Sequence, residues 1–200
     1  MILWFIACGS MSKLESNFDF TAQSWQSWCS EGERTRVLSV YDGDTITVEE
    51  LSGVEEREDC DDSQNEKIRF LGVSAPEIGS EPECYGDESS LFLSSIVEGE
   101  QVDLEFDVEC VDMYCRRLGW VFLEGTDNRI VDMMDEYSLE GLNGDGSYRL
   151  LVNELIIRSG HGVKYRNELD KSERYADRIE RAEEEAEAAG LGLWSNCSQP

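Results

Sequence analysis

Apolar and polar residues alternate with a period of two along several stretches of the chain, the pattern of β-strands with one buried face. The first stretch is interrupted by Asp42-Gly43-Asp44, which is a turn signal, and Pro76 ends the second. The loop between these two stretches, residues 51–66, is strongly acidic. The alternation predicts strands over residues 34–50, 67–73, 102–108 and 117–123.

Helical spacing of apolar residues appears later in the chain. Leu91, Phe92, Ile96 and Val97 share one face of a predicted helix over residues 88–98. Further helices are predicted over 151–159 and 170–189, and a glycine follows each of the three helices. The last helix is mostly Glu, Arg and Ala, so the residues expected to anchor it are Tyr175, Ile179 and Leu191. Residues 126–148 are predicted to be a polar loop. Strands first, with a helix before the fourth strand, indicate a small barrel surrounded by helices.

The first eight residues are apolar and end at Cys8, followed by glycine and serine. This pattern is typical of a lipoprotein signal peptide, in which the cysteine becomes the lipidated N-terminus and attaches the protein to a membrane. The alternatives are a true start further upstream or a merely hydrophobic N-terminus, because no basic residues precede the apolar run. The predicted organisation is a signal segment (1–8), an acidic, Ser-rich tether (9–33), one domain (34–194) and a short tail (195–200).

The charge balance is extreme, with 44 acidic against 17 basic residues and a net charge of −27. Such acidity argues against a nucleic-acid partner, because phosphate binding depends on Lys and Arg. At a salt concentration of about 1 M, however, the Debye length falls to ~3 Å and long-range repulsion is screened. Acidic residues spread along the whole chain favour a protein adapted to high salt, and the alternative is an acidic partner-binding face.

The chain has seven cysteines and one histidine, His161, with no C-x-x-C motif, which argues against a zinc site. So many cysteines in a small domain indicate disulfides and an oxidising compartment, hence a secreted or cell-surface protein. Without Cys8 the number is even, and six cysteines allow fifteen pairings. Cys110 and Cys115, which flank a turn, are the first expected pair.

Three short motifs carry polar groups at the ends of predicted strands. They are the Asp-Gly-Asp-Thr turn at 42–45, a stretch from Arg69 to Glu77 that contains Ser74-Ala75-Pro76, and a stretch that begins Asp112-Met113-Tyr114-Cys115-Arg116. Taken singly, each has an ordinary structural explanation: a turn, a strand end or a surface arginine.

In order and at these spacings, the motifs resemble those of the staphylococcal nuclease family. That family has a D-G-D-T turn, an R-x-x-G-(I/V)-D-A-P-E stretch, Tyr-Gly before the first helix and D-x-Y-G-R at a strand start. Tyr85-Gly86, Val152-Asn153 with Leu155, and Leu193-Trp194 extend the resemblance to most of the chain. It implies an α+β fold, a five-stranded OB-fold barrel with three helices, and a monomeric enzyme that cleaves DNA or RNA.

The resemblance also implies roles for single residues. Arg69 and Arg116 match the family's phosphate-binding arginines, and a guanidinium suits this task because it meets two phosphate oxygens at once. Glu77 matches the carboxylate that positions or deprotonates the attacking water. Tyr114 and Tyr165 match substrate-contacting positions.

Calcium is the metal that the resemblance implies, held by Asp44, residue 74 and the carbonyl of Ala75. The family's second aspartate is Ser74 here, and a shorter, neutral ligand predicts weaker calcium binding. Cys115 replaces the family's glycine before Arg116. Two other classes stay open, a non-catalytic OB-fold binding module and a lipid-anchored structural domain. Retention of Arg69, Glu77 and Arg116 favours the enzyme.

Overall fold

The computed structural model describes residues 32–49, 51, 67–125, 128–141, 147–166 and 174–198, and the structural statements below concern these residues. The Cys8 segment, the tether up to residue 31 and most of the acidic loop lie outside them. The predictions made for those parts therefore stay predictions.

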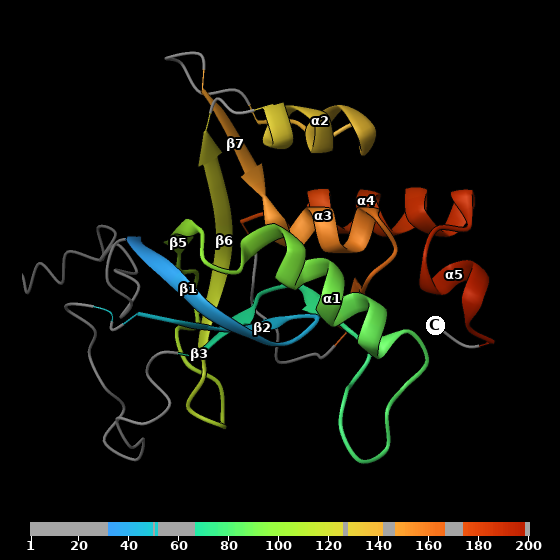
Figure 1. The fold of residues 1–200 in the computed structure, drawn as a ribbon, viewed down its shortest axis with the longest axis horizontal. Helices are drawn as coiled ribbons and strands as arrows, with labels where there is room; N and C mark the ends of the chain where they lie inside the picture. Colours follow the sequence, from blue (N-terminus) through green and yellow to red (C-terminus); the bar gives the residue numbers. More distant parts are fainter. Residues whose placement is uncertain are drawn as a thin grey trace, which may run out of the picture.

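Five strands form a closed barrel, which confirms the predicted OB-fold (Figure 1). The sheet order is β3-β2-β1-β5-β6-β7, and β3 also pairs with β6 in parallel, so that β1, β2, β3, β6 and β5 close a ring. The strands are β1 (Glu33–Asp42), β2 (Thr45–Val48), β3 (Lys67–Phe70), β5 (Gln101–Glu105), β6 (Arg117–Gly125) and β7 (Tyr148–Leu151).

The long strand β1 connects the two halves of the barrel. Its first residues pair with β5 and its later residues with β2, and irregular register in the second half bends the strand. Thr35 and Val37 are buried and their neighbours Arg34 and Arg36 are exposed, which is the alternation that predicted this strand. Small barrels need such a bend because one strand has to turn the corner between two halves of the sheet.

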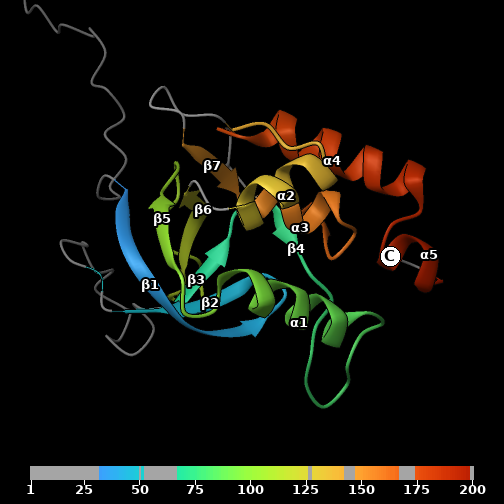
Figure 2. The ribbon, with the colours of Figure 1, turned by 45° about the horizontal axis from the view of Figure 1, so that its top comes forward.

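Five helices are seen among the described residues, where the resemblance implied three (Figures 1 and 2). The expected helices are α1 (Gly86–Val97), α3 (Val152–Arg158) and α4 (Ala176–Ala189). The additional ones are the nine-residue α2 (Asn128–Glu136) and the four-residue α5 (Leu193–Asn196). No helix in the described part of the chain is long and apolar enough to cross a bilayer.

The predicted polar loop over residues 126–148 is wrong in part, since α2 and the start of β7 lie within it. In α2 the buried residues are Ile130 and Met134, one turn apart, a face too narrow to stand out among polar neighbours. Leu151 was assigned to the following helix but closes β7, because a continuous apolar run has no period that separates strand from helix.

Helix α4 packs against α3 through Ile179, Ala182, Glu183 and Ala186, which lie on one face, and it ends at Gly190 with a left-handed φ of 63°. Leu191 was expected to anchor this helix, but it is 37% exposed. The small alanines let α4 approach α3 closely, so α4 is anchored without burial of Leu191.

Asn153, at the start of α3, joins three parts of the fold. Its side-chain oxygen accepts the Val121 N–H at 2.8 Å, and its amide donates to the carbonyls of Leu71 and Gly119 at 2.9 and 3.2 Å. The side chain is fully buried. Helix α3 is thereby fixed to β6 and to the turn that follows β3.

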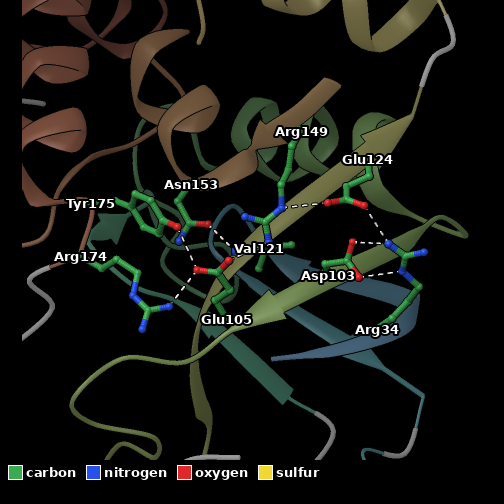
Figure 3. A network of polar contacts seen from close by, with 9 residues as sticks. All are labelled: Arg34, Asp103, Glu105, Val121, Glu124, Arg149, Asn153, Arg174 and Tyr175. Carbon is green, nitrogen blue, oxygen red and sulfur yellow. Dashed lines mark hydrogen bonds and ion pairs between the residues drawn. The ribbon is translucent and has the colours of Figure 1, made fainter. Parts of the chain in front are cut away.

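On the outside of β1, β5, β6 and β7, arginines and acids form an extended network (Figure 3). Arg34 binds Asp103 and Glu124, and Arg149 binds Glu124 and Glu105. Burial alone would raise the pKa of Glu105, but hydrogen bonds from Arg174, Tyr175 and Arg149 outweigh it and lower that pKa. The few basic residues of this acidic chain are thus used to hold strands together.

One disulfide joins two described cysteines, Cys84 and Cys197, which are 113 residues apart in sequence. Cys110 and Cys115 are disulfide-bonded as well. Cys110 and Cys115 are both described residues, yet Cys84–Cys197 is the bond found between described cysteines. The expected pairing of Cys110 with Cys115 is therefore wrong. Disulfides are confirmed, but the short-range pairing inferred from sequence distance is not.

Candidate active site

The turn between β1 and β2 is a built structure and more than a chain reversal. The Asp44 N–H donates to the Asp42 side chain at 3.0 Å, which fixes the turn from inside. A Cβ at Gly43 would lie 2.1 Å from the Ser89 hydroxyl oxygen and 2.6 Å from the Ala75 Cβ, so only glycine fits there. The turn therefore brings Asp44 against Ala75, which follows β4 (Val73–Ser74).

Asp44 is the centre of the site and is only 4% exposed. One carboxylate oxygen accepts the Ala75 N–H at 2.7 Å and meets the Arg69 guanidinium at 2.9 Å. The other oxygen accepts the Thr45 hydroxyl at 3.0 Å. Three polar partners therefore fix this carboxylate, and through it the Arg69 side chain, which is 13% exposed.

Burial, more than any neighbouring charge, sets the protonation behaviour of Asp44. Burial is the main cause that raises the pKa of Asp44 to about 7, and Asp42 raises it further, while the Arg69 guanidinium opposes the shift. Asp42 is itself buried, at 5% exposure. Two neighbouring carboxylates are thus buried, and the Arg69 guanidinium pairs with one of them, Asp44, so a further cation would stabilise the site.

Tyr165 lies next to Arg69, as its predicted substrate-contacting role requires. The Arg69 guanidinium is 5.7 Å from the centre of the Tyr165 ring. The Tyr165 N–H donates to the Gly72 carbonyl at 3.0 Å, just after Ser74 and Val163 pair between β4 and β8 (Val163–Lys164). The pairing of β4 with β8 therefore brings the segment of Tyr165 beside that of Ser74, and Tyr165 lies next to Arg69.

Arg116 is held by Asp112 in a second unit just before β6. One Asp112 oxygen accepts from the Arg116 Nε and Nη2 at 2.8 and 2.7 Å, and the other accepts the N–H groups of Tyr114 and Arg116. Cys115 adopts a left-handed φ of 64°, a conformation that glycine reaches more easily than a residue with a Cβ. Tyr114 is 67% exposed, and its ring centre is 5.5 Å from the guanidinium.

The two arginine units lie on neighbouring strands. Arg69 of β3 is in register with Leu118 of β6, so both side chains share one face of the sheet. Arg116 lies two residues before Leu118, at the entrance of β6. The strand pairing therefore brings the two arginines to the same region of the barrel.

Glu77 is exposed on the loop that leaves Ala75. Its N–H donates to the Glu83 carboxylate at 3.0 Å, and its carbonyl accepts the Glu83 N–H at 2.9 Å. Its side chain makes no hydrogen bond or ion pair with a described residue. The backbone at Glu77 is thus fixed two residues beyond Ala75, while its carboxylate stays available to water.

The few side-chain oxygens near Asp44 suit a hard cation. Asp44, Asp42 and the half-buried Ser74 offer only oxygen, the ligand that calcium prefers. It is the N–H of Ala75 that contacts Asp44. Within the described parts of the chain, no group of three or more His, Cys, Asp or Glu side chains is placed to hold a metal. Hydroxyl, carbonyl and water oxygens would therefore complete any coordination.

Three functional features were missed in the sequence. Asp112 and Glu83 orient the predicted residues Arg116 and Glu77, a role that only tertiary contacts reveal. Lys67 lies 5.2 Å from the centre of the exposed Tyr41 ring. Spacing along the chain gives no signal for this contact, because Lys67 and Tyr41 lie on different strands.

His161 has a packing role. Its ring stacks on Phe92 at 3.8 Å, and its Nδ1 lies 2.9 Å from the Ser159 hydroxyl. Burial lowers its pKa to about 4, so the ring is neutral near pH 7.

The family described as staphylococcal nuclease homologue matches residues 67–196. This range contains Arg69, Glu77 and Arg116 and covers more than half of the chain. The chain belongs to the staphylococcal nuclease family. A thermonuclease of Staphylococcus intermedius is 29% identical over 167 residues, which cover 82% of this chain and 77% of that protein. A thermonuclease of Staphylococcus hyicus is 27% identical over 166 residues, 80% of this chain and 75% of the relative.

Two positions of the chain differ from the staphylococcal nuclease motifs given above. At Ser74 the motif pattern leads one to expect an aspartate, and serine carries no charge. Cys115 occupies a left-handed position in a disulfide-bonded turn.

Proposed function

We propose that this protein is a calcium-dependent nuclease that hydrolyses phosphodiester bonds of DNA or RNA. The observation that carries the proposal is the buried Asp44–Arg69 pair, bonded to Ala75 two residues before the exposed Glu77. A second oriented arginine, Arg116, directly precedes β6, the strand next to that of Arg69. Two oriented cations and one free carboxylate are what in-line attack of water on a phosphodiester needs.

In this mechanism the two guanidiniums bind the phosphate oxygens and stabilise the negative charge that grows in the transition state. Asp44 and Asp112 keep each guanidinium in one orientation, so little reorganisation is needed when the substrate binds. Glu77 orients the attacking water or takes its proton. Tyr165 and Tyr114 offer ring faces next to the arginines for stacking with bases or contact with phosphate.

Asp44, Ser74 and the Ala75 carbonyl would hold the calcium ion, with Asp42 next to them. The ion would supply positive charge close to the reacting phosphate and polarise its oxygen. Two neighbouring buried carboxylates, Asp42 and Asp44, support this assignment.

The second candidate is a non-catalytic OB-fold module that binds single-stranded nucleic acid. Exposed tyrosines at the barrel surface favour binding of this kind. The side chain of Glu77 argues for the enzyme, because an exposed carboxylate that pairs with no cation among the described residues would repel a phosphate and so does not help binding.

The proposal also places the protein outside the cytoplasm, at high salt, as a monomer, in the manner of a secreted haloarchaeal protein. The net charge of −27 and the Cys84–Cys197 disulfide support this environment. Attachment to the membrane through a lipidated Cys8 belongs to the same proposal.

The test is a nuclease assay on the purified, oxidised protein in about 2 M KCl, with plasmid DNA and with single-stranded RNA as substrates. We expect cleavage with calcium and loss of cleavage with EDTA. Binding of nucleic acid without cleavage in calcium would favour the binding module instead. Cleavage that EDTA leaves unchanged would remove calcium from the proposal.

Replacing Ser74 with aspartate is expected to tighten calcium binding by about tenfold or more, because a second anionic oxygen joins Asp44 on a doubly charged ion. Repulsion from the other acids is screened at high salt and acts over longer distances. Titration calorimetry on both proteins measures the effect. The matched control is Ser80→Asp, which adds the same charge at an exposed loop position. Equal or weaker binding in Ser74→Asp would place the metal elsewhere.

A further inference from the structure

We propose that Glu83 and the Cys84–Cys197 disulfide are positioning elements for Glu77, and that reduction of this disulfide lowers turnover. The inference rests on the proposed nuclease function and names the parts of the chain that hold its catalytic loop. Glu83 and Cys84 are adjacent in sequence, so one short segment both binds the backbone of Glu77 and carries a covalent anchor.

The loop is closed by a two-way contact between Glu77 and Glu83. The Glu83 carboxylate accepts the Glu77 N–H at 3.0 Å, and the Glu83 N–H donates to the Glu77 carbonyl at 2.9 Å. Both backbone polar groups of Glu77 are therefore bound by one residue. The side chain of Glu77 has no such contact with a described residue, so its position depends on how firmly this backbone is held.

The start of α1 supports the same contact from the other side. The Gly86 N–H donates to the Glu83 carbonyl at 3.2 Å. A Cβ at Gly86 would lie 2.6 Å from the Glu77 carbonyl oxygen, so the helix start is packed directly on Glu77. Tyr85, between Cys84 and Gly86, has a left-handed φ of 74°, a tight bend that needs its neighbours to hold it.

The disulfide ties this segment to a fixed part of the fold. Cys197 directly follows α5, where Leu193 is 2% exposed and its N–H donates to the Gly160 carbonyl at 2.9 Å. Gly160 closes α3, so α5 is docked on the helix that Asn153 fixes to the barrel. In Figures 1 and 2 the loop that precedes α1 lies on the same side of the molecule as helix α5.

Without the disulfide, the middle of this loop, residues 77–84, is held mainly by the hydrogen bonds between Glu77 and Glu83, which lie close to water. Most of its residues are exposed, including Cys84, so a reductant reaches the bond. Loosening a catalytic loop lowers the fraction of bound substrate that meets the carboxylate in the right geometry. Binding by Arg69 and Arg116, on the barrel, stays unchanged. Turnover therefore falls while affinity is kept, and the enzyme is most active in an oxidising compartment.

The experiment compares wild type with two kinds of variant. Cys84→Ser with Cys197→Ser removes the bond and leaves the other cysteines intact, which a reductant would not. Glu83→Ala removes the acceptor for the Glu77 N–H, and Glu83→Gln restores an acceptor oxygen. Glu81→Ala, an exposed glutamate of the same loop, is the matched control. We expect kcat to fall about tenfold in the double serine variant and in Glu83→Ala, with KM within about twofold of wild type. Glu83→Gln and Glu81→Ala should stay close to wild type.

Amide hydrogen exchange gives an independent readout. Exchange at residues 77–86 should rise in the double serine variant and in Glu83→Ala, while exchange in β1, β2 and β6 stays the same. Unchanged kcat in both variants would overturn the inference, as would a fall in kcat with unchanged exchange of this loop. A wild-type protein without activity would instead overturn the proposed function. If the double serine variant does not fold, the comparison of Glu83→Ala with Glu83→Gln tests the inference by itself.

Discussion

Replacing Glu77 with glutamine is expected to lower kcat by about 10²–10³-fold, because one charged group is removed from a preorganised site. Glutamine has nearly the same shape and keeps the backbone contacts with Glu83, so the loop should stay in place. It neither accepts a proton nor orients water as a carboxylate does. Nucleic-acid affinity should stay within about threefold of wild type, since the phosphate contacts belong to Arg69 and Arg116.

Single-turnover cleavage and equilibrium binding, both at high salt, separate these two effects. Glu81→Gln is the control, since this residue is exposed in the same loop and carries the same charge. A Glu77→Gln variant whose turnover stays within about threefold of wild type would contradict the assigned role. Loss of binding together with loss of turnover would indicate a damaged loop, which hydrogen exchange at residues 77–86 would detect.

The barrel was predictable from sequence because its strands alternate clearly. In β1 the exposed arginines next to Thr35 and Val37 produce a period of two, and burial in the structure follows it. Where the signal was short or uniform, prediction failed. Helix α2 has a buried face of two residues, and β7 joins α3 within one apolar run that has no period of its own.

At the site, sequence motifs gave the residues but not their partners. Arg69 and Asp44 belong to separate motifs, and only the pairing of Thr45 in β2 with Arg69 in β3 brings them together. The roles of Asp112 and Glu83 depend on backbone geometry that composition does not encode. Cysteine pairing was the weakest inference, because Cys84 and Cys197 become neighbours only after α5 docks on the end of α3.

Replacing Asn153 with leucine is expected to lower the free energy of unfolding by about 2–4 kcal/mol, because buried polar groups lose their partner while volume is kept. The Val121 N–H and the Leu71 carbonyl are the groups that lose it. The Gly119 carbonyl also loses a bond, but it keeps the one from the Leu71 N–H at 3.0 Å. Chemical denaturation at fixed salt measures the change.

Two further variants show whether the amide itself carries this stability. Asn153→Asp keeps the oxygen for Val121 but turns a second oxygen toward the carbonyls of Leu71 and Gly119, so it should also be destabilised. Asn128→Leu, at an exposed position of α2, should stay within about 0.5 kcal/mol of wild type. Because Leu71 begins the turn that leads to Ser74 and Ala75, loss of this bond should also weaken calcium binding. An Asn153→Leu protein as stable as wild type would mean that water satisfies these groups, and that α3 is held to the barrel by apolar packing alone.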